Sequence, residues 1–275
     1  MMRMKRCPEQ TDGVEGTYRY FAMAVAAEAG RYLRDNLNNH HQVRFKGVID
    51  IVTEADQQAE DMIVGAIHRQ YPHHDILAEE SAAFTTGSPY RWIIDPLDGT
   101  TNYAHGYPVF CVSIALEWEG NCILGVVYNP MLEEMFVAEA GRGAYLNDRS
   151  LVVSKTEILS ESLLATGFPY DIRWSQENNM NFFQAMAVEV QAIRRAGSAA
   201  LDLAYVAAGR FDGFWELKLH PWDTAAGCLL VREAGGTVTD LRGEAFLLTS
   251  PHVVASNGLI HDQILSVLQG VDKTS

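Results

Sequence analysis

The sequence contains only four cysteines, and no two of them are close enough for the CxxC spacing of a zinc site. Four cysteines in a chain of 275 residues also fall short of the disulfide framework of a small secreted protein. We therefore expect reduced thiols and a cytoplasmic protein.

Long hydrophobic runs are lacking too, because no segment reaches the roughly 20 apolar residues that a membrane-spanning helix needs. The segment Tyr20 to Gly30 is apolar and follows a basic start, but Glu28 interrupts it and the pattern continues into Arg31 and Arg34. This pattern favours an amphipathic first helix over a signal peptide. No membrane partner is expected.

Positive charge is scarce, with 21 Lys and Arg residues against 35 Asp and Glu residues and a net charge of −14 at pH 7. Such a chain repels nucleic-acid phosphates and anionic lipids, and the cluster of Arg3, Lys5 and Arg6 is too short to reverse this, so no direct nucleic-acid binding is expected. A small phosphorylated metabolite would be repelled in the same way. An acidic protein that binds one therefore needs cations in its site.

The chain divides into two patterns of secondary structure. Residues 1–150 predict two helices and a largely antiparallel sheet, from the segments Glu15–Asn38, Ile49–Thr53, Glu54–Gln70, Ile76–Ala78, Trp92–Asp95, Val109–Glu117, Ile123–Tyr128 and Met135–Ala138. Residues 151–275 predict alternating strands and helices, at Leu163–Thr166, Gln176–Val190, Ser198–Ala208, Gly213–Glu216, Asp223–Ala234, Thr237–Asp240, Val253–Ser256 and Leu259–Leu268. We expect an N-terminal α+β half and a C-terminal α/β half, joined near Ser150.

The segment Trp92-Ile-Ile-Asp-Pro-Leu-Asp-Gly-Thr-Thr-Asn102 carries the most chemical information. A short apolar strand leads two aspartates, Asp95 and Asp98, into a tight turn in which Gly99 allows a ligand to approach the backbone. If a helical turn begins at Gly99–Thr100, its free N–H groups would meet a phosphate oxygen.

Further acidic groups follow other predicted elements, at Glu79 after Asp75–Ala78 and at Asp223 before a helix. Taken singly, each acid is explained by a turn or a helix cap. Gathered together without Lys or Arg, however, they would need divalent cations, and oxygen ligands select magnesium or manganese over zinc. The sequence therefore predicts a site with several magnesium ions, open to a phosphate.

These segments together resemble the inositol monophosphatase family of magnesium-dependent, lithium-sensitive phosphatases. The resemblance runs from about Glu15 to Leu268 and rests on Asp50-Ile-Val-Thr-Glu-Ala-Asp56, Ala78-Glu-Glu-Ser81, the segment Trp92 to Tyr103, Gly197-Ser-Ala-Ala-Leu-Asp202 and His220-Pro-Trp-Asp-Thr-Ala-Ala-Gly227. It implies the layered α-β-α-β-α sandwich of the inositol monophosphatase and fructose-1,6-bisphosphatase type, most metal ligands in the N-terminal half, and a homodimer.

The resemblance also implies two or three magnesium ions per site. Glu79, Asp95 and the Leu97 carbonyl would hold the first ion. Asp95, Asp98 and Asp223 would hold the second, and Glu79 would help to hold a third through water.

The implied reaction is hydrolysis of inositol 1-phosphate to myo-inositol and phosphate by metal-activated water, without a covalent intermediate. Thr100 and Asp56 would activate the water, although as an acid in the first turn of a helix Asp56 would also suit the helix dipole. Glu79 would assist as a metal ligand. Lys46 matches a lysine near the metals in relatives.

The implied substrate contacts come from Asp98, Gly99, Thr100, Ser198, Ala199 and Glu216. Glu216 would bond an inositol hydroxyl, whereas Ser198 is explained equally well as a helix N-cap. The resemblance implies no role for His220. This residue is more simply explained as a packed or solvated histidine than as a group that orients Asp223.

Two alternatives stay open. The substrate could be fructose 1,6-bisphosphate or another sugar or nucleotide phosphate of the same superfamily. In the second alternative, the chain acts as a regulatory protein that binds a partner of the transcription machinery.

Overall fold

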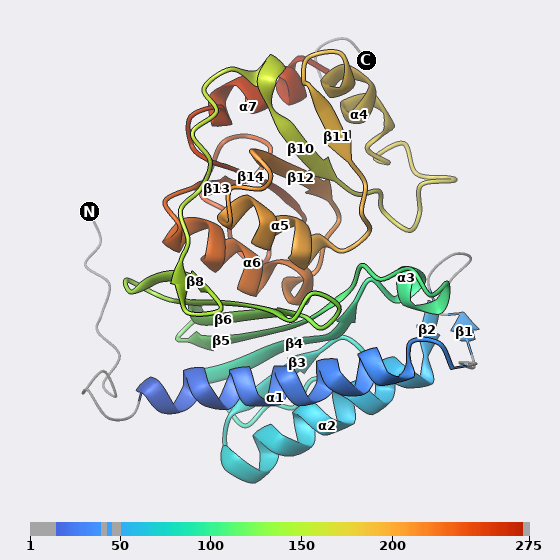
Figure 1. Cartoon of the computed structure of the whole chain (residues 1–275), viewed down its shortest axis with the longest axis vertical. Coiled ribbons are helices and arrows are strands. Elements are labelled where there is room, and N and C mark those ends of the chain that lie inside the picture. The colour runs from blue at the N-terminus through green and yellow to red at the C-terminus, as the bar shows by residue number, and fades with distance from the viewer. Residues whose placement is uncertain (1–14, 40–42, 46–50, 272–275) are drawn as a thin grey trace.

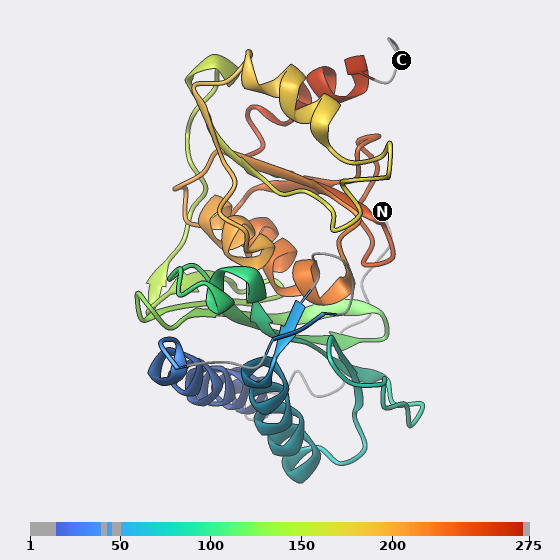
Figure 2. The same ribbon diagram turned by 90° about the vertical axis from the view of Figure 1, so that its right-hand side faces the viewer.

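The computed structural model describes residues 15–39, 43–45 and 51–271. Helices and sheets alternate in layers, as Figures 1 and 2 show. Helices α1 (Glu15–Asn36) and α2 (Glu54–Gln70) cover one face of a seven-stranded sheet, and α5 (Ala199–Ala207) and α6 (Pro221–Glu233) separate it from a five-stranded sheet. Helices α4 (Met180–Ala187) and α7 (His261–Val271) cover the far face. The expected α-β-α-β-α sandwich is thus confirmed.

The seven-stranded sheet runs in chain order from β3 to β9. Only β3 and β4 pair in parallel, so the prediction of a largely antiparallel sheet is confirmed. Its strands are β3 (Asp75–Ala78), β4 (Tyr90–Asp98), β5 (Cys111–Trp118), β6 (Asn121–Asn129), β7 (Glu134–Glu139), β8 (Gly143–Leu146) and β9 (Arg149–Ser150). The sequence did not predict β8 and β9, which are short and mostly partly exposed.

The five-stranded sheet has the order β11-β10-β12-β14-β13. Strand β10 pairs in parallel with β11 and β12, whereas β14 pairs antiparallel with β12 and β13. Its strands are β10 (Leu163–Thr166), β11 (Ala192–Arg194), β12 (Gly213–Leu217), β13 (Thr237–Thr239) and β14 (His252–Ser256), and the 3-10 turn η1 (Leu159–Glu161) precedes β10. Strand β11 was not predicted. The short pair β1 (Val43–Phe45) and β2 (Ile51–Thr53) stands apart.

Helix α4 is shorter than the predicted Gln176–Val190. Its N-cap, Asn179, has a left-handed φ of 69°, and its buried amide accepts a hydrogen bond from Trp215 Nε1 (2.8 Å) and donates one to Thr166 Oγ1 (2.9 Å). Asparagine tolerates this conformation better than most residues. The buried amide therefore fixes where the helix begins, and the residues before it form a loop.

Each interface between layers has its own hydrophobic cluster. Leu33, Ile63 and Trp92 are fully buried between the first helix pair and the seven-stranded sheet. Leu203 and Phe214 belong to the cluster that includes the middle helices, and Trp215 packs toward α7. Strand β4 is buried at every residue except Arg91, which agrees with the apolar segment Trp92–Ile94 in its middle.

The middle helices lie very close to the first sheet at Gly125 of β6. A Cβ atom at this position would lie 2.8 Å from the Ala226 carbonyl oxygen of α6, too near for any side chain. This contact brings α6 against the sheet and so helps to place Asp223 in its first turn.

No helix in the described residues is long and apolar enough to cross a bilayer. The division of the chain into halves near Ser150 stays a prediction, and one hydrophobic cluster contains residues from both sides of it.

We predict that Gly125→Ala lowers the free energy of unfolding by about 1–3 kcal/mol, because the added methyl group overpacks the α6 interface. Gly65→Ala is the matched control: the methyl group meets only the end of the Arg69 side chain, at 3.4 Å, and should stabilise α2 by about 0.5–1 kcal/mol. Urea denaturation measures both. Equal stability of the two variants would contradict the close packing of α6.

Candidate functional site

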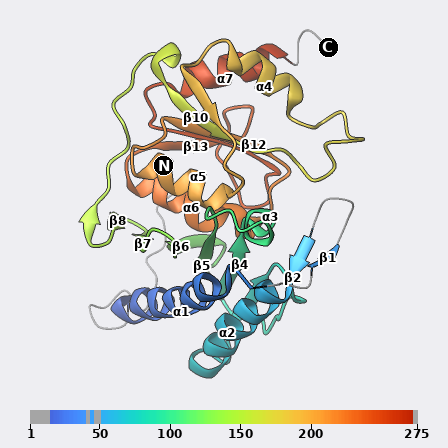
Figure 3. The same ribbon diagram turned by 45° about the vertical axis from the view of Figure 1, so that its right-hand side comes forward.

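The predicted site residues come together where β4 ends, beside α3 (Thr100–Ala104) and the first turns of α5 and α6 (Figure 3). The pairing of β4 with β5 is irregular between Asp95 and Asp98, as the sequence turn predicts. Gly99 then has a φ of 104°, and a Cβ there would lie 2.9 Å from the Val109 carbonyl oxygen. Only glycine fits this turn, which directs Asp95 and Asp98 into the site.

Asp95 and Asp98 are buried, Asp223 is half-buried, and the three form a group of like charges. Burial raises the pKa of Asp95 well above its ordinary value, and the neighbouring charges of Glu79, Asp98 and Asp223 raise it further. Burial and the charge of Asp98 likewise raise the pKa of Asp223. The four acids predicted as metal ligands therefore lie within electrostatic reach of one another.

Backbone groups hold several of these carboxylates. Leu97 N donates to Asp95 Oδ1 (3.0 Å), and His220 N donates to Asp223 Oδ2 (2.7 Å). Glu79 follows β3, with its N–H bonded to the Ile94 carbonyl (3.2 Å). Within residues 51–271, the second oxygens of Asp95 and Asp223 have no hydrogen bond. These oxygens remain available to a ligand.

As they stand, no three His, Cys, Asp or Glu side chains in the described part of the chain are grouped tightly enough to coordinate an ion. The chemistry of the donor set nevertheless fits a divalent cation, because all four groups are carboxylates and none of the causes that shift the pKa of Asp95 or Asp223 is a positive side chain. The Leu97 carbonyl oxygen, the other predicted ligand, lies 3.1 Å from Thr100 Oγ1, whose one hydrogen has a closer acceptor in Asp56 Oδ1 (2.8 Å).

Asp56 and Thr100 meet although 44 positions separate them in the chain. Thr100 Oγ1 donates to Asp56 Oδ1 (2.8 Å), while Asp56 Oδ2 accepts from Thr53 N (2.8 Å). Asp56 therefore lies in the first turn of α2, where it forms a capping box with Thr53, and it also contacts Thr100, its predicted partner. Burial raises the pKa of Asp56, and its hydrogen bonds oppose this rise.

Ser198 occupies the N-cap position of α5, but its side chain does not cap the helix. Its hydroxyl instead donates to Asp98 Oδ2 (2.7 Å), which also accepts from Ala200 N (2.7 Å). The Asp98 carboxylate thus caps α5, and Ala199 begins the helix beside it. This link joins β4 to α5.

Glu216 lies at the end of β12, at the other side of the same cleft, which has a volume of about 110 Å³. Burial, with a contribution from the charge of Asp98, raises its pKa to about 8, and Arg195 opposes the rise. The cleft also contacts Gly99, Thr100, Ser198 and Ala199. The structure therefore brings all the predicted substrate contacts to one cavity.

Three charged residues of the cleft were not predicted to have a role: Arg195, Asp202 and Lys218. Asp202 is 1% exposed, its Oδ1 has no partner among the described residues, and burial raises its pKa well above the ordinary value. Asp202 belongs to the segment Gly197 to Asp202, which carries part of the family resemblance and could have pointed to a role. Because an acid on a helix is usually solvated, this position alone did not predict one. His220 stacks on Trp222 (4.8 Å between ring centres), and Lys46 lies outside the described residues.

Comparisons with known proteins agree with this geometry. A family model described as "Inositol monophosphatase family" matches residues 16–273. The chain is 45% identical to an inositol-1-monophosphatase of Mesorhizobium japonicum (89% of this chain, 93% of that protein) and 47% identical to the Nus factor SuhB of Pseudomonas aeruginosa (90% and 94%). The solved inositol monophosphatase of Anabaena (Nostoc) superposes with a TM-score of 0.85 at 44% identity, covering 93% and 96% of the chains.

We predict that the metal-free protein loses stability as pH rises from 5 to 8. Because the folded pKa of Glu216 (about 8) exceeds its ordinary value of 4.5, the folded state holds a proton that the unfolded state has released. This contribution is complete at low pH and is lost as pH rises through the folded pKa. Glu216→Gln should reduce the fall by on the order of 3 kcal/mol, measured by urea denaturation in chelator. Exposed Glu161→Gln serves as control, and equal pH dependence in both variants would contradict the assignment.

Proposed function

The chain belongs to the inositol monophosphatase family, and from this premise we propose that it hydrolyses inositol 1-phosphate to myo-inositol and phosphate with magnesium as cofactor. The observation that carries the proposal is a group of four carboxylates, in which Asp95 and Asp98 are buried and Glu79 and Asp223 are half-buried beside them. The charges of the other three acids contribute to raising the pKa of Asp95, and the charges of Asp98 and Glu79 contribute to raising the pKa of Asp223. Uncompensated charges of this kind are costly to bury. A role in binding cations accounts for them.

The proposed ligands follow from this group. Glu79, Asp95 and the Leu97 carbonyl would hold one magnesium ion, and Asp95, Asp98 and Asp223 a second. Glu79 would help to retain a third through water. When bound, the ions supply the positive charge that an acidic protein needs to hold a phosphate and to stabilise charge on the reacting oxygens.

Thr100 and Asp56 provide a route for the proton of the attacking water. Since the Thr100 hydroxyl donates its hydrogen to Asp56 Oδ1, its oxygen is free to accept a hydrogen from water. The proton would pass through Thr100 Oγ1 to Asp56, whose burial raises its pKa and so favours acceptance. The water oxygen would then attack the phosphorus directly as the bond between phosphorus and the inositol oxygen breaks, and the inositol oxygen would leave with a proton taken from solvent water. No covalent intermediate forms in this proposal.

Glu216 would recognise the alcohol portion of the substrate. Its carboxyl group lies in the cleft that Gly99, Thr100, Ser198 and Ala199 also contact. Its pKa is about 8 without metal ions, and a cation on Asp98 would offset one cause of that rise. In either form the carboxyl group would accept a hydrogen bond from an inositol hydroxyl, and in its protonated form it would also donate one. Recognition of a polyhydroxylated ring is consistent with such a group.

Two further assignments belong to the proposal. We expect a cytoplasmic homodimer, as the family resemblance implies. Fructose 1,6-bisphosphate and other sugar or nucleotide phosphates are the alternative substrates, since the same site would hold their phosphate.

A regulatory role is the second candidate, because one relative at 47% identity is named a Nus factor. The net charge of −14 suits a basic protein partner better than nucleic acid. A partner that co-purifies with the chain and persists after Asp95→Asn would support this role beside the phosphatase activity.

The direct test is phosphate release at neutral pH from inositol 1-phosphate, fructose 1,6-bisphosphate, 3′-phosphoadenosine 5′-phosphate and histidinol phosphate, with and without magnesium. We predict magnesium-dependent release with inositol 1-phosphate preferred, inhibition by lithium, and loss of activity in Asp95→Asn. Preference for another ester would change the substrate and keep the chemistry. Full activity of Asp95→Asn would contradict the metal assignment.

Thr100 offers a matched pair of variants. We predict that Thr100→Val lowers kcat by about 10²–10⁴-fold, because the hydroxyl that passes the proton to Asp56 is lost. Thr100→Ser keeps a hydroxyl and should stay within about tenfold of the wild type. Steady-state kinetics at saturating magnesium distinguish the two, and similar kcat values would exclude the proton route.

A further inference from the structure

Lys218 adopts a backbone conformation that lysine rarely takes. It follows β12 with a φ of 58°, in the left-handed region, and it leads into the turn before α6. A non-glycine residue there costs free energy, and such residues persist where the surrounding structure fixes them. Glycine would adopt this conformation without strain, so the presence of lysine here indicates that its side chain has a role.

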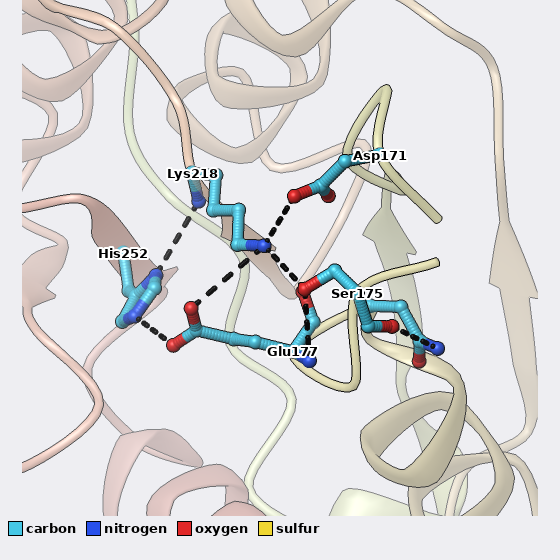
Figure 4. Close-up of polar contacts among 6 residues, drawn as sticks. Asp171, Ser175, Glu177, Lys218 and His252 are labelled. Carbon is cyan, nitrogen blue, oxygen red and sulfur yellow. Dashed lines mark hydrogen bonds and ion pairs between the residues drawn. The ribbon is translucent and has the colours of Figure 1, made fainter. Parts of the chain in front are cut away.

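The Lys218 ammonium group binds the loop formed by residues 168–178, as Figure 4 shows. Nζ donates to Asp171 Oδ2 (2.7 Å) and Ser175 Oγ (2.8 Å), and lies 3.8 Å from Glu177 Oε2. His252 completes the group: Nδ1 accepts from Lys218 N (3.3 Å), which leaves Nε2 to donate to Glu177 Oε1 (3.0 Å). We call this group the Lys218 clasp.

The loop needs this attachment. Its two ends are joined, because Asn179 Nδ2 donates to the Gly167 carbonyl. Near its start the loop is also held by packing, because Pro169 is buried and Phe168 contacts Phe183 (5.6 Å between ring centres), whereas Trp174 in its middle is 61% exposed. Without the lysine, Asp171 and Glu177 would keep two negative charges that no other described lysine or arginine pairs. The middle of the loop would then lose these attachments.

The clasp also adjoins the cleft of the proposed active site. Phe168, Pro169 and Tyr170 line one side of the cleft, and Lys218, together with Glu216, lines another. Fastening the loop to Lys218 therefore fixes the width of the cleft at the end that would receive the alcohol. The phosphate end, at Asp98 and Thr100, lies on other elements.

We propose that Lys218 is a positioning residue that fastens loop 168–178 beside the cleft, and so determines how tightly inositol-sized alcohols are held. The inference about substrate rests on the proposed function. The fastening itself does not.

Trypsin tests the fastening without any substrate, because Arg173 is exposed within the loop. We expect Lys218→Met to speed cleavage after Arg173 by about fivefold, the factor that corresponds to a partly exposed ionic network. Lys218→Gly should do the same although glycine relieves the backbone strain, and Lys218→Arg should restore slow cleavage. Exposed Lys155→Met is the control and should match the wild type. The products, residues 1–173 and 174–275, are identified by mass.

Kinetics test the consequence for substrate. Lys218→Met and Lys218→Gly should raise KM for inositol 1-phosphate about fivefold with little change in kcat, and leave KM for the smaller ester glycerol 2-phosphate within about twofold. A Lys218→Gly variant that behaves as wild type in both assays would overturn the proposal, because the lysine side chain would then be dispensable. Unchanged cleavage in Lys218→Met would overturn it as well.

The two assays separate the proposals. If the wild type does not hydrolyse inositol 1-phosphate but Lys218→Met is cleaved faster, the fastening stands and the proposed function fails. If the wild type is active and neither cleavage nor KM responds to Lys218→Met, the clasp alone is wrong.

Discussion

Repulsion among buried carboxylates is the constraint on which the rest of this structure depends. Burial raises the pKa values of Asp95, Asp98 and Asp223, and the charges of neighbouring acids raise those of Asp95 and Asp223 further. Backbone N–H groups of β4, α5 and α6 reduce this cost by donating to them. They do not remove it, so the arrangement makes physical sense as a site for cations, and an acidic chain needs cations to hold a phosphate.

The layers serve to bring these groups together from distant positions in the chain. Asp95 and Asp98 end a strand buried on both faces, and Asp223 begins a helix that the close contact at Gly125 holds against the same sheet. Ser198 links Asp98 to α5. Two hydrophobic clusters meet at the site, so packing holds its metal end, whereas its alcohol end is bordered by a loop that the Lys218 clasp fastens.

Much of this could be predicted from the sequence. Strand β10 and helix α2 were predicted with the bounds that the structure shows, because apolar periodicity and end signals are strong in both. The turn from Asp95 to Gly99 could be predicted because its two aspartates and its glycine lie close together in the sequence. Helix α4 was predicted too long because nothing local shows that buried Trp215 fixes the Asn179 amide. Asp202 and Lys218 were missed for a similar reason, since their surroundings are formed by segments distant in sequence.

The most direct test of the account is a crystal structure grown with Mn²⁺ and measured at its absorption edge, because manganese replaces magnesium on oxygen ligands and is located by anomalous scattering. The account predicts at least two anomalous peaks among Glu79, Asp95, Asp98 and Asp223, with the Leu97 carbonyl oxygen bound to one of them. Full Mn²⁺ soaking without any peak at these carboxylates would contradict it.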